Sequence, residues 1–336
     1  MKVSEIDELF ESFSTYRIMI IGDVMIDSYL WGKVDRISPE APIPVINVLK
    51  RENRLGGAAN VALNISSLGT ASVICGVTGN DEKSIIFNEL CEQYRISADG
   101  IISLHGRPTT VKTRVIGGNQ HIVRIDEEVD IQISESETKK LSERIFLLLN
   151  KENINAIVIE DYDKGVISPL LIQTVTKEAQ LRNIPVCVDP KKRNFLAYEN
   201  ISLFKPNFRE LNEGLKLDLK KNDFEAIYKA VQVLHRQQNI KEMMVTLSEL
   251  GIFISDGNKF YTIPTHVRSV ADVSGAGDTV IGVATLCKAA GLNAVDTAVI
   301  SNIAGGLVCE RIGVVPIEKN TLLEACKKNV ITQLQK

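Results

Sequence analysis

The segment from Asp272 to Leu286 (DVSGAGDTVIGVATL) joins a turn of small residues to an apolar helix. Glycines at 275 and 277 allow the backbone N–H groups of the helix N-terminus to point at an anion, and the helix dipole adds to that attraction. Asp278 would repel a phosphate bound there, but its carboxylate suits a general base that acts on a hydroxyl attacking phosphorus. The alternative is an ordinary glycine-rich helix start, with Asp278 as a first-turn residue that favours the dipole.

A second glycine pair precedes another predicted helix, in Leu55-Gly56-Gly57-Ala58-Ala59-Asn60. Glycines permit a ligand to approach the backbone closely, and the Asn60 amide can both donate to and accept from hydroxyl groups. Tight packing of a helix on a sheet explains the motif equally well. Asp27, shortly after the first predicted strand, could hold a pair of hydroxyls, although an isolated loop aspartate is more often a turn residue.

Length and composition indicate one large α/β domain. The 336 residues are 44% hydrophobic and 24% charged, with a net charge of −3, and the basic residues are scattered. This charge distribution argues against a nucleic-acid partner. The six cysteines form no CxxC pair and are expected to be reduced core residues. Because we find neither a signal peptide nor an apolar run long enough for a membrane span, we expect no membrane association and a cytoplasmic protein.

Hydrophobic periodicity predicts the elements that position these residues. Regular alternation of strands and helices predicts a doubly wound, mostly parallel sheet. The expected strands are 17–21, 72–77, 156–159, 186–188, 203–205 and 243–247; the expected helices are 1–13, 57–68, 135–150, 168–181 and 223–236, with three more starting near 275, 293 and 318, and a hairpin over 251–263. Short exposed strands within 29–54, together with a hairpin of 109–116 and 121–126, predict a small second sheet.

Together the two glycine motifs make the chain resemble the ribokinase-like (PfkB) carbohydrate kinases. That family carries a Gly-Gly-x-x-Asn motif near the front and a Gly-Ala-Gly-Asp motif near the back, which match 56–60 and 275–278 here. Its Asn-x-x-Glu motif matches Asn207 to Glu210, and 246–251 resembles its nucleotide-side loop. The resemblance implies one ribokinase-like domain over 1–336, use of ATP and Mg²⁺ with a monovalent cation as an option, and a β-sheet lid drawn from about 29–54 and 107–127, through which two copies pair as a homodimer.

The resemblance also implies a role for each matching residue. Asp278 would be the general base, with Gly275, Ala276 and Gly277 as the anion hole. The substrate-binding residues would be Asp27, Gly56, Gly57, Asn60, Arg114, Asp161, Lys164 and Lys191. The nucleotide-binding residues would be Asn207, Glu210, Thr246, Ser248, Gly251 and Asn302, with Glu210 facing magnesium through water.

Within that family, five further stretches resemble the heptose 7-phosphate kinases: 22–27, 36–42, 107–114, 161–165 and 188–191. This implies ATP-dependent phosphorylation of the anomeric hydroxyl of D-glycero-β-D-manno-heptose 7-phosphate, in the synthesis of ADP-heptose. The distal phosphate would meet Lys191, Arg114, Lys112 or Lys164, with Lys191 the first choice. One departure is Glu160, where that group has a small polar residue. We also expect no nucleotidyltransferase domain, because none of the four histidines fits its HxGH-type motif.

Two other functions stay open at this point. The same Asp278 could serve a kinase of another sugar, such as fructose 6-phosphate or ribose. A catalytically silent sensor of sugar or nucleotide is less consistent with an intact base and glycine turn. A dehydrogenase is disfavoured because Gly22-Asp23 lacks the G-x-G-x-x-G run of a pyrophosphate site.

Overall fold

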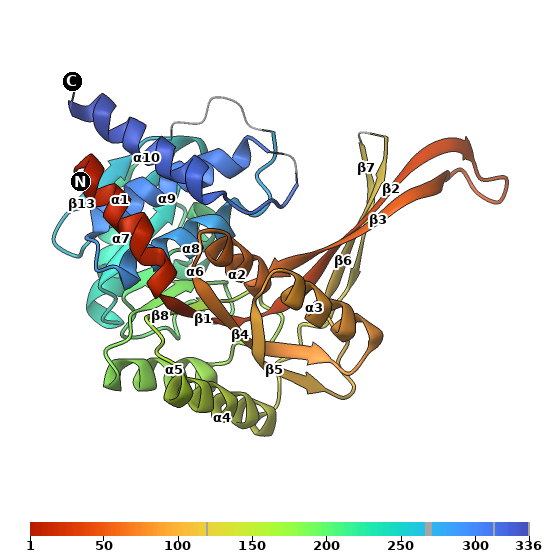
Figure 1. Cartoon of the computed structure of the whole chain (residues 1–336), viewed down its shortest axis with the longest axis horizontal. Coiled ribbons are helices and arrows are strands. Elements are labelled where there is room, and N and C mark those ends of the chain that lie inside the picture. Colours follow the sequence, from red (N-terminus) through yellow and green to blue (C-terminus); the bar gives the residue numbers. More distant parts are fainter. Residues whose placement is uncertain (119, 266–270, 312, 335–336) are drawn as a thin grey trace.

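A nine-stranded sheet runs through the main body of the molecule (Figure 1). The computed structural model describes residues 1–118, 120–265, 271–311 and 313–334. In spatial order the strands are β13 (Phe260–Ile263), β12 (Ile252–Ser255), β11 (Glu242–Thr246), β10 (Leu203–Phe204), β9 (Val186–Asp189), β8 (Ala156–Glu160), β1 (Arg17–Gly22), β4 (Ala71–Gly79) and β5 (Ser97–Leu104). The seven strands from β11 through β10, β9, β8, β1 and β4 to β5 run parallel to one another, whereas β12 and β13 form an antiparallel edge beside β11.

Helices cover both faces of this sheet and create two hydrophobic cores. One face packs against α1 (Val3–Ser12), α2 (Ala58–Ser67), α3 (Glu82–Gln93), α8 (Ala276–Ala289), α9 (Ala294–Cys309) and α10 (Lys319–Leu334). The other packs against α4 (Glu135–Lys151), α5 (Pro169–Leu181), α6 (Phe208–Leu215) and α7 (Phe224–Gln237). The sequence of β1 is continuously apolar because both of its faces are buried: Ile18 and Ile20 enter the first core, and Met19 and Ile21 enter the second.

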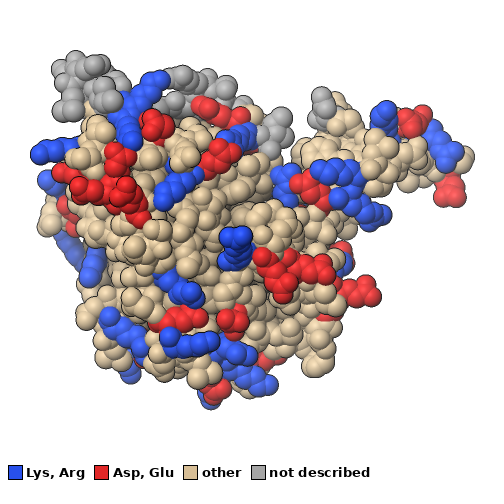
Figure 2. Space-filling view, viewed as in Figure 1, with Lys and Arg blue, Asp and Glu red and all other residues tan. Residues whose placement is uncertain are grey.

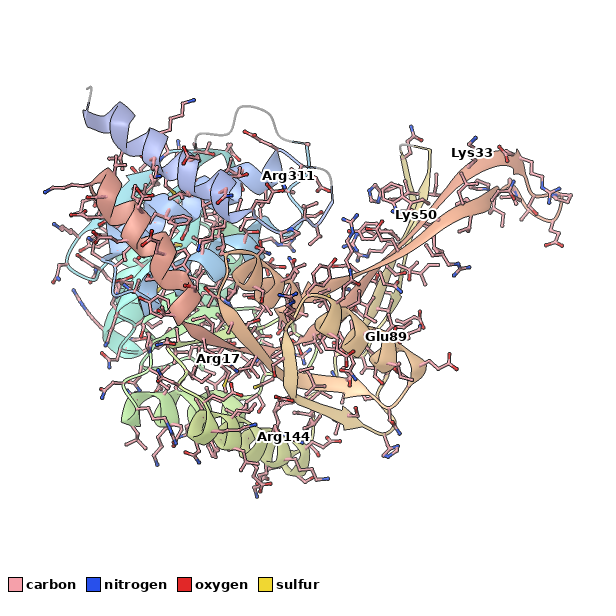
Figure 3. All side chains as sticks on the ribbon, viewed as in Figure 1. Arg17, Lys33, Lys50, Glu89, Arg144 and Arg311 are labelled. Atoms are coloured by element: carbon pink, nitrogen blue, oxygen red, sulfur yellow. The ribbon has the colours of Figure 1, made fainter. Side chains whose placement is uncertain are left out.

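A separate four-stranded sheet forms the arm that projects from the main body (Figure 1), in the order β3-β2-β6-β7. Its strands are β2 (Val24–Ile37), β3 (Pro44–Gly57), β6 (Val111–Gly117) and β7 (Gln120–Glu127). Lys33 and Lys50 mark the β2–β3 hairpin in Figure 3. The expectation of short strands within 29–54 was wrong, because β2 and β3 are long strands paired over most of their length.

The prolines of that hairpin do not interrupt it. Pro39 and Pro42 lie between the two strands, and Pro44 is the first residue of β3, a position where a missing N–H costs no interior hydrogen bond. Register shifts between Trp31 and Gly32 and between Val34 and Arg36 absorb the remaining irregularity.

The expected fold class is confirmed: a mostly parallel, doubly wound sheet flanked by helices, with a smaller second sheet. Three elements, α3, β5 and α6, were not predicted from the sequence. Helix α6 is short and begins at the Asn207 cap, whereas α3 and β5 mix polar and apolar residues without a clean period. Among the described residues, no helix combines the length and apolar character that a membrane crossing requires.

The order of the strands identifies one place, at the ends of two neighbouring inner strands, where a ligand site is expected. From β1 the chain moves outward to β4 and β5 on one side, then returns to β8 and continues through β9 to β11 on the other side. The C-terminal ends of β1 and β8, at Gly22 and Glu160, are therefore the topological switch point of the sheet. Ligands of open α/β sheets bind in the crevice outside such a point.

Candidate active site

Asp278 lies in the first turn of α8 and is only 6% exposed. Both of its carboxylate oxygens accept a hydrogen bond: Asn60 Nδ2 donates to Oδ2 at 2.6 Å, and the Tyr162 hydroxyl donates to Oδ1 at 2.8 Å. Burial raises the pKa of Asp278 to about 6, against the lowering effect of these two bonds. A carboxylate with such a pKa is ionised at neutral pH and basic enough to accept a proton from a positioned hydroxyl.

Gly275 caps α8 in a left-handed conformation, with φ of 78°. A side chain there would be strained and would also crowd Asn60 and Val314. The Ala276 N–H donates to the Val273 carbonyl at 3.3 Å, while the N–H groups of Gly277 and Asp278 precede the helix's own hydrogen-bond ladder. A Cβ on Gly277 would lie 3.9 Å from Asp189 Oδ2 and from Lys205 Nζ, which is ordinary contact, so the packing of these described side chains does not itself require glycine at this position.

A row of three charged side chains ends β8, β9 and β10 on the face toward α8. Glu160 and Asp189 are register partners, and Lys205 follows β10 beside them. Lys205 is 2% exposed and its ammonium lies 2.7 Å from Asp189 Oδ2. Glu160 is fully buried, and neither of its carboxyl oxygens has a hydrogen-bond partner among the described residues. Burial, reinforced by Asp189 and Asp278, raises the pKa of Glu160 well above its usual range, so we infer that it is neutral.

The loop after β8 holds Tyr162 against Asp278. Buried Asp23, directly after β1, accepts hydrogen bonds from the backbone N–H groups of Tyr162, Lys164 and Val166 at 2.8, 3.1 and 3.0 Å. Asp161 points into the protein, where its carboxylate accepts from the Asp163 N–H and from the side chains of Asn194 and Tyr198. In this structure Asp161 therefore shapes the loop; its predicted contact with substrate stays a prediction.

The base of the small sheet carries the predicted sugar-binding residues. Asp27 on β2 is 6% exposed and forms an ion pair with Arg114 on β6. A side chain on Gly56 would collide with the Asp27 carboxylate, and Gly57 has a φ of 57°. Arg54 and Arg114 both lie over the ring of Tyr29, with guanidinium carbons 4.7 and 5.4 Å from its centroid. Tyr29 in turn stacks on Trp31.

All four predicted distal-phosphate cations have acidic partners. Lys112 contacts Asp126 and Glu128, and Lys164 contacts the same Glu128 at 2.7 Å. Arg114 pairs with Asp27 as described above. Lys191 pairs with Glu210, so it lies toward the predicted nucleotide side of the sheet. This placement weakens the preference for Lys191 as the distal-phosphate residue.

Four of the predicted nucleotide-side residues belong to α6 and the loop after β11. Asn207 and Glu210 form a reciprocal capping box: the Asn207 side chain accepts from the Glu210 N–H, and the Glu210 carboxylate accepts from the Asn207 N–H, each at 2.8 Å. Ser248 and Gly251 bound a short turn with φ of 54° and 86°. Thr246 bridges to Asn207. Asn302 on α9 donates to the Pro264 carbonyl at 2.8 Å.

The fold thus brings Asp278, Gly275 to Gly277 and Asn60 together at the switch point, as the two glycine motifs suggested. Sequence reasoning missed Tyr162, Asp189 and Lys205 as members of this cluster. Their only signals were that Tyr162 and Asp189 belong to the stretches 161–165 and 188–191, and that Lys205 ends an apolar strand directly before Pro206-Asn207. The roles assigned to all these residues stay predictions.

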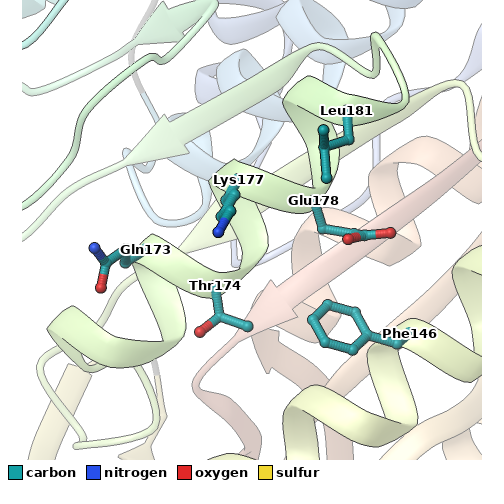
Figure 4. Close-up of a pocket in the computed structure, with 6 residues that line it drawn as sticks. All are labelled: Phe146, Gln173, Thr174, Lys177, Glu178 and Leu181. Atoms are coloured by element: carbon teal, nitrogen blue, oxygen red, sulfur yellow. The ribbon is translucent and has the colours of Figure 1, made fainter.

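Other features of the described residues offer weaker candidates. No group of three or more His, Cys, Asp or Glu side chains in these parts of the chain is arranged to hold a metal ion. A surface groove of about 520 Å³ lies between α4 and α5 and is lined by Phe146, Gln173, Thr174, Lys177, Glu178 and Leu181 (Figure 4). It lies on the helical layer opposite α8, away from the strand ends. On the face shown in Figure 2, basic and acidic side chains are interspersed.

Solved structures of sugar kinases share this fold. Phosphofructokinase-2 from Escherichia coli, in its tetrameric inhibited form, superposes with a TM-score of 0.74 over 92% of this chain and 98% of that chain, at 19% identity. Arabidopsis thaliana ribokinase, complexed with ribose and ATP, gives a TM-score of 0.70 over 93% and 99% of the two chains, at 18% identity. These similarities establish the fold alone.

Curated relatives are closer in sequence. The chain is 38% identical over 308 residues to the bifunctional protein HldE of Koribacter versatilis, covering 92% of this chain and 62% of that protein. It is 37% identical over 313 residues to the bifunctional protein HldE of Magnetococcus marinus, covering 93% and 64%. The chain therefore spans a little under two thirds of the length of these relatives. The pfkB family carbohydrate kinase profile matches residues 16–320, and the chain belongs to this family of sugar kinases.

Proposed function

We propose that this kinase transfers the γ-phosphoryl group of ATP to the anomeric hydroxyl of D-glycero-β-D-manno-heptose 7-phosphate. The observation that carries the transfer chemistry is Asp278, a buried carboxylate held by Asn60 and Tyr162 at the switch point of the sheet. The heptose assignment is supported by the five stretches that resemble heptose 7-phosphate kinases and by the similarity to bifunctional proteins HldE.

In the proposed reaction, the sugar lies under the small sheet with its hydroxyls near Asp27, Gly56, Gly57 and Asn60. Asp278 accepts the proton of the anomeric hydroxyl while that oxygen attacks the γ-phosphorus in line. The N–H groups at the start of α8 face the charge that develops on the phosphoryl oxygens. Because Gly277 carries no side chain, a phosphate can approach this backbone closely.

Magnesium is the metal that this family membership implies, and the residues present fit it. Carboxylate oxygens are its preferred ligands, and Asp189 Oδ1 is buried without a hydrogen-bond partner in the part of the chain that the structure describes. Glu210 would face the metal through water, as its Asn-x-x-Glu motif suggests. When bound, the ion neutralises charge on the β- and γ-phosphates.

The arm formed by the small sheet would act as the lid over the sugar and as the dimer interface. Its surface exposes a set of apolar side chains that an isolated sheet would need to cover: Val34, Ile37, Ile43, Val48, Leu49, Ile122, Val123 and Ile125. The distal phosphate of the sugar would exchange places with a carboxylate partner of Arg114, Lys112 or Lys164, because each of these cations is already paired.

The proposal is tested by incubating the purified protein with ATP, magnesium and the heptose 7-phosphate, and in parallel with fructose 6-phosphate and with ribose, while following phosphorus NMR. We expect a new anomeric phosphate from the heptose phosphate and none in the Asp278→Asn variant. Phosphorylation of fructose 6-phosphate or ribose instead would overturn the heptose assignment and keep the sugar kinase. Retained binding of sugar or ATP without any turnover would favour the sensor.

A further inference from the structure

The geometry points to Tyr162 as a positioning residue for the base. The Tyr162 hydroxyl holds the Asp278 carboxylate, and Lys191 contacts the Tyr162 ring and connects it to Glu210 on the nucleotide side. This inference rests on the proposed function, because it assigns Tyr162 a part in the same transfer. Its evidence is a continuous series of contacts from Glu210 through Lys191 and Tyr162 to Asp278.

The last contact of this series, from Tyr162 to Asp278, constrains the base directly. With Asn60 on Oδ2 and Tyr162 on Oδ1, the carboxylate cannot rotate without breaking a charge-assisted hydrogen bond at one oxygen. Each oxygen keeps further lone-pair capacity, so a sugar hydroxyl can still donate to the base. A base fixed in this way is oriented before the substrate arrives, which is the condition for an effective proton transfer.

The backbone of Tyr162 is itself held in place. Its N–H donates to Asp23, and the same carboxylate accepts the N–H groups of Lys164 and Val166, so the whole loop is anchored to the end of β1. Asp163, the next residue, has a left-handed backbone with φ of 55°, which turns the chain sharply after the tyrosine. The hydroxyl therefore reaches Asp278 from a fixed loop.

Lys191 connects this tyrosine to the other half of the site. Its ammonium lies 5.3 Å from the centre of the Tyr162 ring, within the range of a cation–π contact, and it also pairs with Glu210. A displacement of Glu210 on the nucleotide side would thus move Lys191 and, through it, the Tyr162 ring that orients the base.

The groups around Asp278 determine how loss of the Tyr162 hydroxyl should change the pKa of Asp278. The groups that face it are Tyr162 from the loop, Glu160, Asp189 and Lys205 from the strand ends, and Asn60 from α2. Tyr162 is one of the two hydrogen-bond donors that lower the pKa of Asp278 against burial. Tyr162→Phe should therefore raise this pKa and move the acid limb of the rate profile to higher pH.

The test compares Tyr162→Phe with the matched control Tyr198→Phe, which also removes a buried hydroxyl from an aspartate, Asp161, but does not touch Asp278. Protein labelled with ¹³C at aspartate carboxyls is titrated by NMR, and the Asp278 signal is identified by its loss in Asp278→Asn. We expect the wild-type signal to titrate at about pH 6 and the Tyr162→Phe signal about one pH unit higher, with Tyr198→Phe unchanged. This readout needs no substrate, so it remains informative if the proposed sugar is wrong.

Kinetics supply the second readout. At pH 8, where the base is ionised in both proteins, Tyr162→Phe should lower kcat about tenfold to a hundredfold with little change in the KM for the sugar. Lys191→Met should also lower kcat, and the double variant should be hardly slower than the worse single one. An unmoved Asp278 titration, or equal effects of Tyr162→Phe and Tyr198→Phe on kcat, would overturn the role of Tyr162. Multiplying effects in the double variant would overturn the role of Lys191.

Discussion

The strand ends of the main sheet and the edge strands of the small sheet use charged residues in opposite ways. At the strand ends of the main sheet, Asp189 and Lys205 form an ion pair whose side chains are 6% and 2% exposed. On the small sheet, Lys50 pairs with Glu52 and Arg124 with Asp126, with the basic side chains 66% and 58% exposed. Exposed pairs contribute little to stability, whereas a buried pair has lost its water and depends on its partner. An ion pair is thus a surface feature on the edge strands of the small sheet and a structural requirement at the strand ends of the main sheet.

The apolar side chains show the same contrast. Strands β1 and β8 bury apolar side chains in two cores, one on each face of the main sheet. The small sheet leaves Ile122, Val123 and Ile125 between 36% and 51% exposed on β7. The main sheet buries its apolar side chains within the chain, while the small sheet leaves apolar side chains exposed. Each of the following predictions tests one side of this comparison.

The largest effect is expected at the buried carboxylate itself. Asp278→Asn should reduce kcat by about 10² to 10⁴, because an amide cannot accept the hydroxyl proton. The same change should leave thermal stability equal or higher at pH 7.5. Folding raises the pKa of Asp278 from 3.8 to about 6. The ionised carboxylate therefore destabilises the folded protein by up to about 3 kcal/mol above pH 6, and this penalty disappears as the pH falls from 6 towards 3.8.

Differential scanning fluorimetry at pH 7.5 and pH 5 checks the stability of this variant. The advantage of Asp278→Asn over the wild type should shrink at pH 5, where the wild-type carboxyl is mostly protonated. A variant that loses stability at both pH values would show that the hydrogen bonds from Asn60 and Tyr162 outweigh the cost of burying the charge.

The next largest effect is expected at the buried ion pair. Lys205→Met should lower the free energy of unfolding by about 3–5 kcal/mol, because it leaves the Asp189 carboxylate buried without its cation. Urea denaturation measures the change. The control is Lys139→Met, which removes an exposed pair with Glu135 on α4 and should have no measurable effect. Similar losses in the two variants would mean that burial does not distinguish these pairs.

The smallest effect on stability is expected on the exposed sheet. Val123→Asp should change the unfolding free energy of a single chain by less than about 0.5 kcal/mol, because this side chain is 51% exposed. If two copies pair through the small sheet, the variant should elute as a monomer in size-exclusion chromatography with light scattering while the wild type elutes as a dimer. Leu181→Asp, at a 72% exposed position on α5, is the control that should leave the mass unchanged. A wild-type monomer would reject pairing.

Much of the architecture could be predicted from local pattern. The apolar runs of β1 and β8 and the caps of α4 and α5 are local signals, because a strand buried on both faces must be continuously apolar and a helix start must satisfy its free N–H groups. The long β2–β3 hairpin was underestimated because its prolines suggest interruption, and only pairing with a neighbouring strand shows that they lie outside the ladder.

For the site, the sequence alone determined the residues of the two glycine motifs, their order and the chemistry that a carboxylate beside a helix N-terminus can perform. Only the tertiary structure decided that Tyr162 holds Asp278, that Lys205 neutralises Asp189, and that Lys191 reaches Glu210. These pairs are 116, 16 and 19 residues apart, and their members lie on different strand ends, loops and first turns of helices. Parallel strands bring such positions together through their register, and a single chain's local pattern contains no record of which strand ends become neighbours.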